Sequence, residues 1–314
     1  MSRDGTVLLT GGTAQVGLHL LPLLQHAGFQ TVALSRSIKP VENPMPMQAN
    51  ENRWLHPGQF HTMMAADREG LMAAVEHPRW LISAGPIGLA IELLDCCSSI
   101  RRMVCLSTTS VFTKAESSNQ AEREQIAGIL QAESRLKEVC TARGIDLVIL
   151  RPTLIYGCGM DQNISRVARF IKRFGFVPLA GPATGLRQPI HVADLAALML
   201  RASQSELRGQ HEFVVAGGST LAYREMVARI FRALGKTPRM ISLPAGLLVK
   251  AVSLAGRARS LEGMNSAMVQ RQNQDLVFDD SATRQCFDFQ PRPFEPGPED
   301  FKLSAEVGAY LPAG

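Results

Sequence analysis

The chain has 314 residues, which at about 150 residues per domain predicts two domains and a core that needs no disulfides or metals. Its 26 Gly and 18 Pro are close to ordinary usage, which excludes collagen-like and low-complexity proteins. The formal net charge is +5, and no basic run exceeds two residues, so we expect no nucleic-acid partner. The composition also holds 26 Arg but seven Lys, and only three Tyr.

The sequence shows neither a membrane span nor a metal site. Residues 1–5 run into one short apolar segment without a signal-peptide core, so we expect a cytoplasmic protein. No apolar stretch reaches the roughly 18 residues of a membrane helix. The six cysteines form no Cys-x-x-Cys pair and have no His at zinc spacing, which favours free structural thiols.

Short aliphatic runs alternate with longer helical patterns, the order expected of repeated βαβ units. The expected strands are Thr6–Thr10, Thr31–Leu34, Phe60–Met64, Trp80–Ser83, Met103–Ser107 and Leu147–Leu150. The expected helices are Val16–Ala27, Asp67–Glu76, Ile87–Ser98 and Ala121–Ala142. Strands joined by crossover helices run parallel, so the sequence predicts an α/β fold with a doubly wound parallel sheet.

Two segments depart from this rhythm. The proline-rich segment 39–58 is predicted to be a surface loop. Later in the chain, Gln188–Val192 and Glu212–Val215 are short strands that we expect to return to the first sheet. Asp194 is expected to cap the helix between them, and His191 to have a structural role.

A glycine-rich turn follows the first strand. The segment Thr10-Gly11-Gly12-Thr13-Ala14-Gln15-Val16-Gly17 passes directly into a helix. Glycines at such a turn allow positive φ and let the backbone approach a pyrophosphate, whose charge the helix N-terminus favours. The turn therefore predicts dinucleotide binding by Gly11, Gly12, Thr13, Ala14, Gln15, Val16 and Gly17.

These features resemble the extended and atypical short-chain dehydrogenase/reductase family, whose fingerprint is TGxxGxxG. Gly11 and Gly17 match its first and third glycines, while Ala14 stands at the middle one. Similar segments follow at 107–112, 150–157 and 187–196. The resemblance implies an NAD(P)-binding Rossmann domain and a smaller substrate domain of the epimerase/dehydratase type. We assign residues 1–155 with 186–217 to the first domain, and 156–185 with 218–314 to the second.

The second expected strand ends in Ser35-Arg36, with no acid nearby. An acid there binds the ribose of NAD, whereas an arginine pairs with the 2′-phosphate of NADP. We therefore expect NADP, with NAD as the alternative. Ser83, Ala84 and Pro152, at the ends of later strands, are also assigned to the cofactor site.

The usual catalytic pair of the family, Tyr-x-x-x-Lys, is absent. Four residues after Tyr156, Tyr223 and Tyr310 stand Met160, Val227 and Gly314. Within the helix where the pair belongs, Gln125 with Ile129, or Ala127 with Gln131, are the equivalent places. The remaining catalytic candidates are Ser107, Thr108 and Thr109 after the fifth strand, Lys114 beyond them, and Tyr156.

Two arginines are expected to bind substrate. Arg187 stands where the family's nucleotide-sugar enzymes place an arginine against the diphosphate, and Arg271 resembles a second one. The resemblance thus implies an epimerase- or dehydratase-like oxidoreductase acting on a nucleotide sugar or similar small molecule, with a homodimer as a possible assembly. The missing pair keeps two alternatives open: a non-catalytic NADPH-binding regulatory or assembly protein, and a reductase of a non-sugar ketone or enone that uses Lys114.

Overall fold

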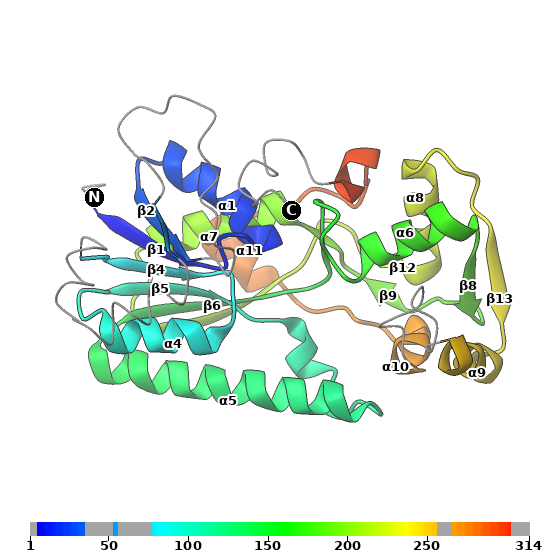
Figure 1. Cartoon of the computed structure of the whole chain (residues 1–314), viewed down its shortest axis with the longest axis horizontal. Coiled ribbons are helices and arrows are strands. Elements are labelled where there is room, and N and C mark those ends of the chain that lie inside the picture. The colour runs from blue at the N-terminus through cyan, green and yellow to red at the C-terminus, as the bar shows by residue number, and fades with distance from the viewer. Residues whose placement is uncertain (1–4, 35–52, 56–76, 256–265, 303–314) are drawn as a thin grey trace.

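A computed structural model describes residues 5–34, 53–55, 77–255 and 266–302. Its main feature is a parallel sheet in the order β11-β6-β5-β4-β1-β2-β3 (Figure 1). The strands are β1 (Thr6–Thr10), β2 (Gln30–Leu34), β3 (Arg53–Leu55), β4 (Trp80–Ser83), β5 (Arg102–Leu106), β6 (Asp146–Pro152) and β11 (Gln210–Val215). This order confirms the predicted doubly wound α/β fold.

Helices cover both faces of the sheet because its central strands are apolar on both sides (Figure 1). On one face, Val7 and Leu9 of β1 share a core with α1 (Gln15–His26) and α7 (Val192–Gln204). On the other, Leu8 of β1 shares a core with α4 (Ile87–Cys96) and α5 (Gln120–Arg143). Continuous apolar strands are typical of a parallel sheet buried on both faces.

The second part of the molecule extends beyond the carboxyl ends of the strands (Figure 1). Its short strands are β7 (Ile155–Tyr156), β8 (Val177–Ala180), β9 (Leu186–Arg187), β10 (Ile190–His191), β12 (Leu221–Ala222) and β13 (Met240–Leu243). Its helices are α6 (Ile164–Phe174), α8 (Tyr223–Ala233), α9 (Ala245–Ala255) and α10 (Ser266–Gln270). The helix α11 (Ser281–Phe287) instead packs against the main sheet, beside β11 and α7. A separate small core joins α6, α8 and β8. None of the helices that the structure describes is both long and apolar enough to cross a bilayer.

Several expected elements need correction. The loop predicted at 39–58 contains a strand, since β3 pairs with β2. The strand Gln188–Val192 does not return to the main sheet: its core, β10, pairs with β7 instead, whereas β11 does join the sheet beside β6. The expected strand at 60–64 and helix at 67–76 lie outside the described residues.

The start of α7 also differs from expectation. His191, not Asp194, caps the helix: its Nδ1 accepts from the backbone N–H of Ala193 at 3.1 Å. Asp194 lies in the first turn and instead accepts hydrogen bonds from Arg292, at 2.8 Å from Nη2 to Oδ1. The imidazole is fixed at the start of the helix because its other nitrogen, Nε2, lies 3.0 Å from Asp300 Oδ1. The ring therefore spans from the helix to the C-terminal segment, which supports its structural role.

Candidate functional site

The glycine turn has the geometry that the sequence predicts. Gly11 has φ +71°, and its carbonyl accepts from the backbone N–H of Ala14 at 2.8 Å. A Cβ on Gly11 would stand 2.6 Å from the carbonyl carbon of Ala84, and one on Gly17 would stand 2.1 Å from the Gly11 oxygen. Both contacts are far too close for any side chain, so these glycines let strand, turn and helix approach each other.

The middle position of the fingerprint tolerates alanine in the backbone. Ala14 has φ −75° and ψ 156° and directly precedes α1, so it needs no positive φ. The neighbouring positions divide by burial: Gly12 and Val16 are buried, while Thr13, Ala14 and Gln15 are partly exposed at the turn. The partly exposed residues are thus the ones placed to meet a ligand.

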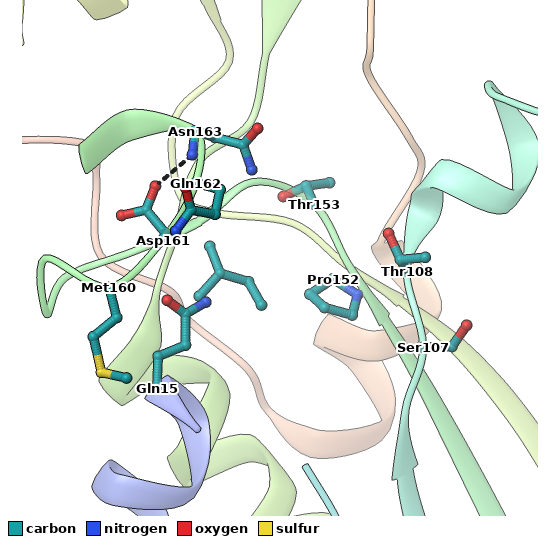
Figure 2. A pocket seen from close by; sticks show the side chains of 10 residues that line it. Gln15, Ser107, Thr108, Pro152, Thr153, Met160, Asp161, Gln162 and Asn163 are labelled. Carbon is teal, nitrogen blue, oxygen red and sulfur yellow. Dashed lines mark hydrogen bonds between the residues drawn. The ribbon is translucent and has the colours of Figure 1, made fainter. Parts of the chain in front are cut away.

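A cavity of about 360 Å³ opens beside this turn, at the carboxyl end of the sheet (Figure 2). Figure 2 shows three sides of it: the start of α1, the ends of β5 and β6, and the loop before α6. Its lining residues are Gln15, Ser107, Thr108, Pro152, Thr153, Ile155, Met160, Asp161, Gln162 and Asn163. Open α/β sheets bind ligands at this edge, where the strand order reverses.

The chemistry of this cavity fits a dinucleotide. Gln15 Oε1 is buried and has no hydrogen-bond partner among the described residues, although its side chain reaches the cavity (Figure 2). A buried amide oxygen without a partner is costly, so a donor from a bound group would stabilise it. The close-packed glycine turn and this unpartnered oxygen are both compatible with a bound dinucleotide at this edge of the sheet.

A second, larger cavity of about 880 Å³ adjoins the first and shares Thr108, Thr153, Gln162 and Asn163 with it. It reaches into the second part of the molecule, toward α6 and α8. Among the described residues its charged lining is mostly basic: Lys114, Arg166, Arg169, Arg173, Arg187 and Arg271 against Glu122. This excess of positive charge in the cavity lining favours an anionic ligand.

The three hydroxyls after β5 have different surroundings. Ser107 Oγ donates to the buried carboxylate of Glu133, and Thr109 Oγ1 donates to the Pro152 carbonyl at 3.1 Å. Thr108 Oγ1 accepts from the backbone N–H of Ser110 at 3.1 Å. Its hydroxyl hydrogen has no acceptor among the residues that the structure describes. Thr108 lines both cavities, which makes it the best placed of the three to donate to a ligand.

Tyr156 lies in the core rather than in either cavity. Its side chain is 2% exposed, and its ring packs edge-on against His191 and Phe294, with centroids 5.1 and 4.8 Å apart. Burial raises the pKa of its phenol, and the nearby Asp300 carboxylate raises it further. Tyr156 is therefore a packing residue, and the structure gives it no access to a substrate.

Lys114 and Arg271 meet at one carboxylate. Both Arg271 guanidinium nitrogens donate to Glu122 at 2.8 Å, and Lys114 Nζ lies 3.8 Å from the same carboxylate. Burial would raise the Glu122 pKa, but hydrogen bonds from Arg271 and Ser117 outweigh it and lower the pKa to about 2. Burial also lowers the Lys114 pKa; Glu122 opposes that shift and Arg271 adds to it.

Arg187 is bound mainly to the protein itself. Its guanidinium donates to the carbonyls of Leu186, Gln274 and Arg271, at 2.7, 2.7 and 2.5 Å. The group also lies over the Tyr223 ring, 5.4 Å from the centroid. Burial lowers the Arg187 pKa to about 10. The side chain lines the larger cavity, but several of its donors already bind carbonyls of the C-terminal segment.

The remaining predicted cofactor residues divide into three groups. Ser83 is fully buried, and its Oγ accepts from Thr10 Oγ1 at 2.9 Å, so it supports the turn from inside. Ala84 packs against Gly11, and Pro152 lines the smaller cavity. Ser35 and Arg36 lie outside the described residues.

Some residues of the site were not predicted. The α6 arginines and the loop residues Gln162 and Asn163 line the larger cavity, and Gln125 lies there too, one of the two places suggested for the missing tyrosine. The only available signal was the spacing of Arg166, Arg169 and Arg173, which places them on one face of a helix. Among the described residues, no group of His, Cys, Asp or Glu side chains could hold a metal ion.

The fold and the turn define a dinucleotide-binding α/β protein, and the comparisons specify its family. Residues 7–216 match the NAD dependent epimerase/dehydratase family. The chain belongs to this family.

Individual relatives are distant. UDP-glucose 4-epimerase of Vibrio cholerae is 23% identical over 74% of this chain and 69% of its own length. Agroclavine dehydrogenase of Claviceps fusiformis is 24% identical, over 84% of this chain and 85% of its own. Among solved structures, MoeE5 in complex with UDP-glucose and NAD has a TM-score of 0.63 at 20% identity, covering 97% of this chain and 96% of that one. The structural likeness shows the shared fold.

Proposed function

We propose that this chain is an NAD(P)-dependent, epimerase- or dehydratase-like oxidoreductase that acts on a nucleotide sugar or a similar phosphorylated substrate. The observation that carries the proposal is the pair of adjoining cavities. The smaller one lies at the glycine turn, and the larger one is lined mainly by basic residues. A cofactor in the first and an anionic substrate in the second would meet at Thr108 and Thr153.

The chain's own residues would hold the cofactor in a simple way. The N-terminus of α1 would receive the pyrophosphate, because helix N–H groups and the helix dipole favour an anion. Gln15 Oε1 would accept a hydrogen bond, and Pro152 and Thr153 would form the opposite wall. When bound, the nicotinamide supplies hydride transfer to or from the substrate.

Thr108 and Lys114 are our candidates for handling the substrate's proton in place of the missing Tyr-x-x-x-Lys pair. Thr108 would orient a substrate hydroxyl or carbonyl from the junction of the cavities. Lys114 lines the larger cavity, and its lowered pKa brings the ammonium closer to the range in which a general acid works. Ser107 and Thr109 would hold this strand end in place through Glu133 and Pro152.

The test measures turnover with a panel of substrates. Purified protein with NADPH or NADH, or with the oxidised forms, is incubated with UDP-glucose, UDP-glucuronic acid and a set of ketones and enones. Nicotinamide absorbance and product analysis give the rates. The non-sugar members are included because agroclavine dehydrogenase is among the relatives. Lys114→Gln should lower kcat about a hundredfold or more if Lys114 transfers a proton, while Lys172→Gln, an exposed lysine on α6, should leave it unchanged.

Cofactor choice is tested separately. We propose NADP, through Arg36, because a guanidinium matches the 2′-phosphate. Arg36→Ala should weaken NADPH binding about tenfold and leave NADH binding unchanged. Equal effects on both cofactors, measured by calorimetry, would contradict the assignment.

A second candidate is a non-catalytic NADPH-binding regulatory or assembly protein. The observation that favours it is Gln125, which lines the larger cavity on α5 at one of the places where the family's tyrosine is expected. An amide does not ionise and cannot supply a proton. Tight cofactor binding with no turnover of any member of the panel would support this candidate.

A further inference from the structure

The exposed face of α6 carries an unusual combination of side chains. Ile164, Ala168 and Ile171 face the small core. Besides Ile164 and Val167, the side chains of this helix that line the cavity are two aromatic residues and three arginines, namely Phe170, Phe174, Arg166, Arg169 and Arg173. Helical periodicity explains the separation, since residues three and four apart share a face. One wall of the larger cavity is therefore both cationic and aromatic.

The other cations of the cavity have protein partners that reduce their availability. Arg271 is paired in bidentate fashion with Glu122, so the two charges nearly cancel. Arg187 donates to three carbonyls of its own chain. Its guanidinium keeps its positive charge, but several of its N–H donors are already used. Lys114 shares the Glu122 carboxylate with Arg271. The positive groups at the place where the family resemblance puts the diphosphate are thus largely paired or hydrogen-bonded within the protein itself.

The α6 arginines are held differently. Arg169 donates to the carbonyl of Gly159 at 3.1 Å, and Arg173 lies 5.3 Å from the centroid of the Phe174 ring. Neither forms an ion pair with a carboxylate of the residues that the structure describes. Arg166 donates to Gln162 Oε1 at 3.1 Å. Burial and the neighbouring Arg169 charge lower the Arg166 pKa, whereas the Asp161 carboxylate raises it.

We propose that the cavity face of α6, through Arg169 and Arg173 with Arg166 beside them, is the phosphate subsite of this chain, and that its ligand carries a diphosphate. This inference rests on the proposed function, because it concerns the substrate cavity of that same site. Guanidinium groups pair with phosphate oxygens in bidentate fashion. Two adjacent arginines on one helix face suit two linked phosphates better than a single carboxylate.

The aromatic residues of the same face indicate what else the ligand carries. Phe170 and Phe174 lie together, with ring centroids 4.5 Å apart, and both line the cavity. A planar heterocycle attached to the diphosphate could pack against these rings. Nucleoside diphosphates fit this combination, whereas inorganic pyrophosphate would use the arginines alone.

The test compares two neighbouring positive charges on α6. Arg173 and Lys172 both lie in the last turn of the helix, so both interact with its dipole, but only Arg173 lines the cavity. Calorimetry at low salt would measure binding of UDP, UDP-glucose and inorganic pyrophosphate to the NADPH-loaded protein. The variants are Arg173→Gln, Arg169→Gln/Arg173→Gln and Lys172→Gln.

We expect the double variant to bind UDP and UDP-glucose about tenfold or more weakly, and Lys172→Gln to bind within about twofold of the wild type. Pyrophosphate should depend on the same arginines but bind more weakly than UDP. Added salt should weaken the binding of all three ligands, since exposed charges are screened. Equal binding by the double variant and the wild type would overturn the subsite.

The outcomes separate this inference from the proposed function. If the protein binds NADPH and turns over a substrate, but its UDP affinity is unchanged in the Arg169 and Arg173 variants, the subsite alone is refuted. A protein that binds NADPH but none of the three anions also refutes the subsite alone. A protein that binds neither NADPH nor NADH, but whose UDP binding depends on Arg169 and Arg173, would instead refute the proposed function and keep the subsite.

Discussion

The sheet and the part beyond its carboxyl ends position their groups by different means. Around β1, backbone contacts set the positions. Glycines without side chains let the turn, α1 and the loop after β4 touch one another, and an apolar core lies on each face of the strand. In the second part, arginine side chains reach carbonyls and carboxylates across long stretches of chain, as Arg187 and Arg271 do. The first region should therefore be sensitive to added atoms, and the second to charge, pH and salt.

The largest expected effect comes from a buried charge that does not follow this division. On the sheet side, Arg151 Nη2 lies 2.6 Å from Glu133 Oε2, and the two side chains are 7% and 3% exposed. Glu133→Gln would leave Glu212 as the only carboxylate paired with Arg151 among the described residues. It would also leave one amide oxygen where two carboxylate oxygens accept from Arg151 and Ser107. We expect a loss of about 3 kcal/mol in the free energy of unfolding, measured with urea.

The matched control is Glu138→Gln on the same helix, whose carboxylate is 63% exposed and pairs with Arg135. It should change stability by less than about 0.5 kcal/mol. Similar losses in both variants would show that the sheet region depends on charge as generally as the second part does.

Gly17→Ala should be the next most damaging change. Its methyl group would stand 2.1 Å from the Gly11 oxygen, and overpacking of this kind costs about 1–3 kcal/mol. NADPH affinity should fall as well, because the turn must move. Gly128→Ala in α5 is the control: no atom lies within 4 Å of the added Cβ, so alanine should stabilise the helix by about 0.5–1 kcal/mol.

The second region should instead show a pH dependence, because its Arg271 pairs with Glu122 of α5. The Glu122 pKa in the folded chain is about 2, below its ordinary value of 4.5. A lowered pKa stabilises the fold above the unfolded value, and this contribution disappears as the pH falls from about 5 to 2. After allowance for solvent screening we expect about 1–2 kcal/mol.

Urea unfolding at several pH values measures this contribution. Glu122→Gln should flatten the acid limb of the stability curve, whereas Glu124→Gln, an exposed neighbour on α5, should leave it as in the wild type. An unchanged acid limb in Glu122→Gln would mean that the Glu122–Arg271 pair does not join the two regions.

The smallest effect is expected for an exposed pair of the second region. Arg232 lies 3.0 Å from Glu225, but their side chains are 60% and 41% exposed. Arg232→Gln should therefore lower the unfolding free energy by less than about 0.5 kcal/mol. A loss above 1 kcal/mol in thermal or urea unfolding would show that even exposed arginines hold this region together.

Local patterns predicted the sheet region well. A glycine turn between a strand and a helix involves residues close in sequence, so the residue pattern alone was enough to place Gly11 and Gly17. Alternating elements likewise gave the parallel sheet. The short strand β3 was missed because three residues within a proline-rich segment carry little periodicity, and its pairing with β2 is decided by the sheet.

The larger cavity could be predicted only in part. Arg187 was placed through the family resemblance, but its bonds to the carbonyls of Gln274 and Arg271 join residues more than 80 positions apart. The Glu122–Arg271 pair spans 149 positions. The α6 arginines were not predicted, because their spacing indicates at most that they share one helix face and not what that face meets. Tyr156 shows the same limit, since burial depends on packing against His191 and Phe294.

The position of α11 has a consequence for how the protein is made. Phe287, at the end of this helix, packs edge-on against Phe213 of β11, with ring centroids 5.0 Å apart, and Phe287 and Phe289 belong to the same core as β1 and α1. A ribosome synthesises β1 long before it reaches these aromatic residues. The core beneath the cofactor turn therefore stays incomplete until α11 and Phe289 have emerged, and a fragment that stops at β11 would expose apolar surface.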